Sequence, residues 1–123
     1  MLKSLTTYVE AKLGLTIGTD LFAGFVDEPP ADYSVIQEGA GNTDVDGAQL
    51  RNIPIQVRTV GDDHHETRAR AYAIHDLLVN SFGVDIGNGF LLQSITGGTP
   101  GYFEMSGQGR HEFSANYLLK VEV

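Results

Sequence analysis

Apolar and polar residues alternate with a period of two along two long stretches of the chain. In residues 111–123 the odd positions from Phe113 onward are apolar, and the even positions are polar except for Leu118. Residues 51–60 repeat the pattern, with isoleucine or valine at three alternate positions. This period predicts long strands, each buried on one face and wet on the other. A one-sided antiparallel sheet needs a cover on its apolar face, and its open face and edges stay available to other chains.

A helical period appears at the N-terminus. Leu2, Leu5, Val9 and Leu13 recur at the spacing of one helix face, and Gly14 follows as a stop signal. The pattern predicts a first helix that ends before this glycine.

A second helix is predicted after the strand of residues 51–60. Asp63 and Glu66 fit a capping box, in which the aspartate accepts from the first-turn amides and the glutamate reaches back. We expect the helix to run to about Phe82 and to be closed by Gly83. Its predicted apolar face consists of Ile74, Leu77, Leu78 and Phe82.

Shorter strands are predicted between turns rich in glycine and proline, at residues 21–25, 33–38, 90–96 and 102–105. Helices and strands follow each other in separate groups. The expected fold is therefore one α+β domain over residues 1–123, with a mainly antiparallel sheet of four to five strands and two helices packed on one face.

Composition narrows the function. Sixteen acidic residues against eight basic ones give a net charge of −8, which argues against a broad surface for nucleic acid or anionic membrane. Solubility is the plain explanation, and a surface that does not hold DNA is the alternative. The absence of cysteine favours a reducing compartment, and no signal peptide or membrane span is evident.

Residues 39–49 are polar, glycine-rich and without periodicity, which predicts a long loop between two strands. Pro54 lies inside the next strand, and its missing N–H indicates an unpaired strand edge. Flexible loops and unpaired edges are what this chain can offer a neighbouring subunit. We therefore expect the interface to include Gly39, Gly41, Asn42, Asp44, Asp46, Gly47 and Pro54.

A calcium site in this loop is a weaker interpretation. Asn42, Asp44, Asp46 and Gly47 match the first, third, fifth and sixth positions of a calcium-binding loop. The twelfth position needs a bidentate glutamate, and here it is Ile53. The pattern favours an acidic loop with an Asp-Gly turn and no metal.

Four histidines are the candidates for chemistry. His64 and His65 are neighbours at a helix start, where successive side chains diverge by about 100°, so they are poorly placed to share a metal. His75 and His111 are each expected to be structural. With no Walker lysine, nucleophile elbow or cysteine in the chain, we expect no enzyme, no cofactor and no metal.

The apolar run PGYFEM, between two glycine turns, has two interpretations. Tyr102, Phe103 and Met105 can belong to the core, which is the favoured prediction. As an exposed tip they would instead anchor an interface, because aromatic residues and methionine are enriched at contact surfaces.

Together these segments resemble the tail terminator and minor capsid protein family of long-tailed, siphovirus-type bacteriophages. The resemblance rests on LGLTIGTDLF after the first helix, on PPADYSVIQEGAG, on IPIQVRTVGDD running into ETRARAYAIHDLL, and on the closing GQGRHEFSANYLLKVEV. It covers nearly the full length, through structural motifs and not through a catalytic signature.

The resemblance implies an α+β virion protein that assembles in the host cytoplasm as a homo-oligomeric ring, commonly a hexamer. Its partners would be the tail tube protein and a head completion or connector protein, at the head–tail junction. DNA would pass through the ring without being bound tightly. The alternatives are another head–tail connector or minor capsid component, or a small enzyme or ligand-binding domain that uses His75 or His111.

Overall fold

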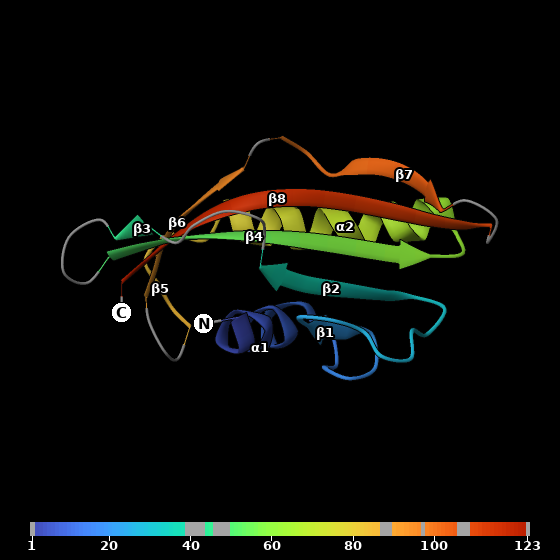
Figure 1. Cartoon of the computed structure of the whole chain (residues 1–123), viewed down its shortest axis with the longest axis horizontal. Helices are drawn as coiled ribbons and strands as arrows, with labels where there is room; N and C mark the ends of the chain where they lie inside the picture. The colour runs from blue at the N-terminus through green and yellow to red at the C-terminus, as the bar shows by residue number, and fades with distance from the viewer. Residues whose placement is uncertain are drawn as a thin grey trace.

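A computed structural model describes residues 2–38, 44–45, 50–86, 90–96, 98–105 and 109–122. Two helices and eight strands follow each other within these ranges (Figure 1). Five strands have five or more residues, and the other three have two or three. The elements are α1 (Leu2–Leu13), β1 (Leu21–Ala23), β2 (Tyr33–Glu38), β3 (Asp44–Val45), β4 (Leu50–Gly61), α2 (His64–Val79), β5 (Val84–Asp85), β6 (Phe90–Thr96), β7 (Gly101–Met105) and β8 (Arg110–Glu122).

The two strands with the longest alternating patterns form the centre of the sheet. β4 and β8 are antiparallel and paired along their whole length, from Leu50 opposite Glu122 to Gly61 opposite His111. The main strand order is β1-β2-β4-β8-β6-β5, with β3 beside β4 and β7 beside β8. Only β1 and β2 are parallel among these pairs. The expected α+β class with a mainly antiparallel sheet is confirmed.

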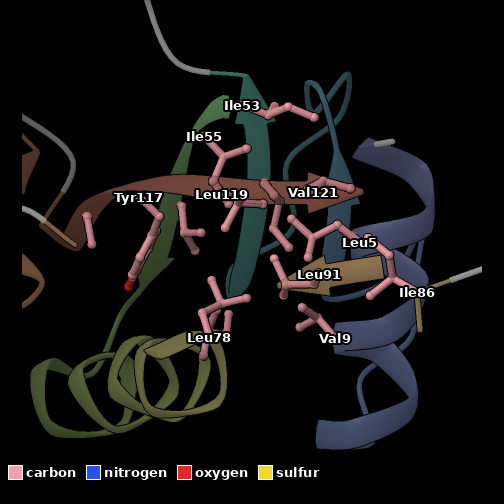
Figure 2. Packing of buried hydrophobic residues seen from close by; sticks show 14 of the residues in the cluster. Leu5, Val9, Ile53, Ile55, Leu78, Ile86, Leu91, Tyr117, Leu119 and Val121 are labelled. Atoms are coloured by element: carbon pink, nitrogen blue, oxygen red, sulfur yellow. The ribbon is translucent and has the colours of Figure 1, made fainter. Parts of the chain in front are cut away.

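Both helices cover the same face of this sheet, as predicted. Figure 2 shows Leu5 and Val9 of α1 and Leu78 of α2 pointing towards the strands. Three odd-numbered side chains of β4 and four of β8 belong to the same cluster. Its strand members are Leu21, Ile36, Ile53, Ile55, Val57, Leu91, Ala115, Tyr117, Leu119 and Val121.

Two boundaries in the N-terminal third depend on glycine. α1 ends at Leu13 because Gly14 adopts a φ of 68°, a left-handed conformation that favours glycine. β1 ends at Ala23, because Gly24 has a φ of 88°. The prediction that this strand continues to Phe25 is therefore wrong by two residues, and Phe25 is left on the surface.

α2 begins as predicted. The Asp63 carboxylate accepts a hydrogen bond of 2.9 Å from the Glu66 amide, and this bond lowers the pKa of Asp63. Gly61, just before the helix, has no room for a side chain. A Cβ there would lie 2.3 Å from Thr67 Oγ1 and 2.4 Å from an Arg70 nitrogen, so glycine permits the close approach of β4 and α2.

α2 ends at Val79, earlier than predicted. Side chains donate hydrogen bonds to the last backbone carbonyls of the helix. Asn80 Nδ2 donates to the Asp76 oxygen at 2.7 Å, and Ser81 Oγ donates to the Leu77 oxygen at 2.6 Å. The predicted apolar face is correct for Ile74 and Leu78, which are fully buried, and Leu77 is half-buried. It is wrong for Phe82, which lies beyond the helix and is 64% exposed.

Candidate assembly interface

The open face of the sheet, opposite the helices, is the first candidate contact surface. Polar side chains bridge three strands on it, with Gln37 Nε2 donating to Gln56 Oε1 at 2.8 Å and Gln56 Nε2 donating to Ser114 Oγ at 3.1 Å. Next to these hydrogen bonds, an Arg58 nitrogen lies 2.6 Å from Glu112 Oε1. Several even positions of β4 and β8 therefore pair with one another through polar side chains.

Pro54 and Leu118 place apolar groups on the open face. Pro54 lies directly opposite Leu118 in the β4–β8 register, and Leu118 is 36% exposed. The pairing of β4 with β2 stops at Ile55, and its pairing with β3 starts at Asn52. Among the described residues Pro54 therefore has no partner on that side, which fits its missing N–H. However, β4 is a central strand and not the sheet edge that the proline suggested.

A second candidate surface lies at the β1–β2 edge. Phe25 is 75% exposed. It stands between a shallow hollow of about 690 Å³ and a smaller one of about 220 Å³, and its side chain borders both. Asp27 and Glu28, both exposed, line the larger hollow. The surrounding loop covers a small cluster on the open face, in which Phe22 packs edge-on against Tyr33 with ring centroids 6.1 Å apart.

Arg110 holds this loop to the start of β8. Its guanidinium donates to the Pro30 oxygen at 2.6 Å and to the Ala31 oxygen, and it lies 3.5 Å from an Asp62 oxygen. Sequence reasoning missed this residue, because its partners are distant along the chain and no local pattern marks them.

β7 is the third candidate. The favoured prediction placed its aromatic residues in the core, and the structure corrects this: Tyr102 is 44% exposed and Phe103 is 57% exposed. Among the described residues β7 is paired on one side only, with β8, so its outer edge faces away from the sheet (Figure 1). The prediction failed because β7 is an edge strand, and an edge strand exposes side chains that a central strand would bury.

Three of the histidines gather at the beginning of α2. The His64 ring lies 5.5 Å from that of His65, 5.3 Å from that of His111 and 5.0 Å from that of Tyr102. The Tyr102 hydroxyl and His111 Nδ1 are 2.7 Å apart. The sequence did not indicate that His111 joins the pair, since only the register of β8 and the position of α2 bring them together.

His75 is buried under the sheet. Its Nδ1 lies 2.8 Å from the Tyr117 hydroxyl, and burial, with a smaller contribution from Asp76, raises the pKa of Tyr117 well above its usual range. Both side chains are buried, as expected for the structural role predicted for His75.

The predicted interface residues are only partly within the described ranges. Gly39, Gly41, Asn42, Asp46 and Gly47 lie outside them. Asp44 belongs to β3 and is paired with Asn52. Ile53, which occupies the twelfth position of the calcium-loop pattern, is buried in the core at 8% exposure. The described residues hold no group of three or more histidine or acidic side chains that suits a metal ion.

A one-sided sheet with exposed aromatic side chains at its edges is typical of structural proteins that assemble with other chains. Residues 8–123 match the family model described as bacteriophage tail terminator protein. The chain belongs to this family and is a structural protein of the virion. The resemblance derived from the sequence is thereby confirmed at the level of the tail terminator family.

A chain in a solved structure titled "Virion of native gene transfer agent (GTA) particle" has a similar fold. The TM-score is 0.66, the sequences are 15% identical, and the match covers 98% of this chain and 94% of that chain. At this identity the likeness shows the fold alone. The comparison with curated proteins found no match. Neither α1 nor α2, which are the helices of the described residues, has the length and apolar character to span a membrane.

Proposed function

We propose that this protein forms a ring, in the expected case a hexamer, on the head-proximal end of the tail tube of a long-tailed, siphovirus-type phage. There it stops polymerisation of the tube and presents the surface that joins the head. The family match over residues 8–123 supports this role. The single observation that carries it is that α1 and α2 cover one face of the β4–β8 sheet, which leaves the other face and the β7 edge open to other chains.

The contacts would be shared between two kinds of partner. The predicted loop residues Gly39, Gly41, Asn42, Asp44, Asp46 and Gly47 stay a proposal for contacts with a neighbouring subunit or the tube. Pro54 belongs to this proposal together with Leu118, because the two place an apolar site among polar side chains of the open face. A head completion or connector protein would bind the opposite side of the ring.

We propose a role without catalysis, cofactor or metal. His75 is supported by Tyr117, and His111 by Tyr102, so both histidines named in the alternative enzyme hypothesis have structural partners. The ring contacts of His64 and His65 point to packing in the same way.

DNA would pass through the ring without being held. Each copy contributes a net charge of −8. Two of the basic side chains, Arg58 and Arg70, are engaged by Glu112 and Asp32. Duplex affinity comes largely from clustered basic contacts that release counterions, and this chain offers few of them. We therefore expect no micromolar duplex binding at about 150 mM salt, and such binding would refute the proposal of a non-adhesive channel.

The test of the ring is mass by light scattering over a concentration series, with and without the tail tube protein of the same phage. We expect a ring, formed at high concentration or on the tube end, and tubes that stop growing when the protein is added. Binding to head portals and not to tubes would favour the connector alternative. A protein that stays monomeric in every condition and does not affect tube growth contradicts the terminator role.

A further inference from the structure

We infer that neighbouring copies in the ring join head to tail, with the Phe25 edge of one copy seated against the Phe103 edge of the next. This inference rests on the proposed ring. We call the first surface the β1 patch, formed by Phe25 with Asp27 and Glu28. We call the second the β7 patch, formed by Phe103 with Gln56, Thr99, Ser114 and Asn116.

The two aromatic anchors, Phe25 and Phe103, lie near opposite edges of one sheet, and the β7 patch extends from its edge over β8 to β4. The strand order places β1 beyond β2 on one side, and β7 beyond β8 on the other (Figure 1). A contact between two different patches leaves each free on the outer copies, so it continues until a ring closes. A contact between two identical patches would stop at a dimer.

Each patch combines an exposed aromatic side chain with a hollow. Phe25 is 75% exposed and borders the hollow of about 690 Å³. Phe103 is 57% exposed and borders a hollow of about 300 Å³ over β8. Large aromatic side chains near hollows are the usual anchors of protein interfaces.

The charges of the two patches favour a contact between unlike patches over a contact between two β1 patches. Asp27 and Glu28 are both exposed in the β1 patch, so two β1 patches facing each other would bring four carboxylates together. Among the described residues, those that line the hollow of the β7 patch carry no charge, and Gln56, Thr99, Ser114 and Asn116 offer amide and hydroxyl donors. The chain has a net charge of −8, and the β7 patch is a surface on which Asp27 and Glu28 of a second copy can bind without repulsion.

The sharpest test uses two variants, Phe25→Asp and Phe103→Asp, alone and mixed. Each should raise the concentration needed for assembly by about thirtyfold or more, as expected for a hot-spot residue. A mixture of the two should form a heterodimer and nothing larger, because only one intact β1 patch and one intact β7 patch remain. Phe82→Asp is the control, since Phe82 is 64% exposed but lies in neither patch, and it should assemble like the wild type.

A second pair of changes tests the charge argument. Asn116→Asp places a carboxylate in the β7 patch at nearly constant shape, at an exposed position, and should weaken assembly. Adding Asp27→Asn and Glu28→Gln to the same chain should restore it. Unchanged thermal melting of each variant shows that the fold is intact.

The outcomes separate this interface from the terminator function. A wild type that caps tubes, with both phenylalanine variants still forming rings, overturns the interface and leaves the function standing. A wild type that forms rings but does not cap tubes overturns the function, and a heterodimer from the mixture then still supports the interface. Loss of tube capping with rings intact in Phe25→Asp or Phe103→Asp assigns that patch to the tube and overturns the inference.

Discussion

Leu118 and Leu119 are neighbours in β8 and have the same side chain, yet they lie in opposite surroundings. Leu119 points under the helices and is fully buried, whereas Leu118 points to the open face and is 36% exposed. Successive side chains of a strand point to opposite faces, so one residue of the pair serves the core and the other the surface.

The comparison extends to the polar groups of the two faces. Under the helices, the hydroxyls of Ser34 and Thr59 meet at 2.9 Å in a buried pair, because a buried polar group without a partner is costly. On the open face, Gln37 and Gln56 pair within reach of water, where the same bond contributes less. The larger core cluster lies on the covered face, so stability should depend mainly on it, whereas the exposed polar part of the open face is available for recognition.

The largest effect should come from the leucine pair. Leu119→Ala should lower the free energy of unfolding by about 2–5 kcal/mol, because it leaves a cavity in the core. Leu118→Ala should cost about 1 kcal/mol or less, since its surroundings are partly water. Urea unfolding of both variants at low protein concentration gives the two values. Equal losses would mean that the open face is covered in the isolated chain.

The next effect concerns the hydroxyl buried on the covered face. Tyr117→Phe leaves His75 Nδ1 without its hydroxyl partner and should cost about 1–3 kcal/mol. The residue keeps its ring, so packing with α2 is largely preserved. A loss below the scatter of the urea data would show that the hydrogen bond is unimportant.

Tyr117 also predicts a pH dependence on the alkaline side. Burial raises its pKa in the folded state, whereas an unfolded tyrosine ionises near pH 10. The stabilisation is therefore complete below about pH 10 and decreases as the pH rises above it, because the unfolded chain releases the proton first. The unfolding free energy of Tyr117→Phe should decline less than that of the wild type over this range. Identical slopes would contradict the assignment.

A smaller effect is expected for the ion pair of the open face. Arg58 and Glu112 are 2.6 Å apart, with side-chain exposures of 32% and 16%. A double-mutant cycle with Arg58→Met and Glu112→Gln should give a coupling of about 0.2–1 kcal/mol, reduced by salt. A coupling as large as the cost of Leu119→Ala would refute the division between the two faces.

The last effect concerns the cap at the start of the helical cover. The pKa of Asp63 is lowered by the Glu66 amide, so its stabilisation is present above the unfolded pKa and is lost as the pH falls through the folded pKa. Asp63→Ser keeps an acceptor without the charge and should remove this acid-side dependence, while Asp63→Ala should also lose the cap. Urea unfolding midpoints of the wild type and both variants, compared at neutral and acidic pH, measure this dependence. An unchanged acid-side slope in Asp63→Ser would exclude this role.

Much of the fold could be predicted because its signals are local. Alternation over residues 51–60 and 111–123 predicted β4 and β8, and the bounds of β2 and β6 agree with the predicted residues 33–38 and 90–96. The cap at Asp63 was found from one aspartate and the glutamate three positions later. Local pattern and backbone preference are encoded over a few residues, so one sequence is enough to recognise them.

The surroundings of the aromatic and histidine residues were decided by tertiary structure. Phe82 and Phe103 looked like core residues by sequence, but one lies beyond the end of α2 and the other on an edge strand. His111 joins His64, and Arg110 joins Pro30, only because β8 brings segments far apart in sequence together. Hydrophobic patterning determines which side chains need cover, whereas the order and register of the strands decide which of them receive it.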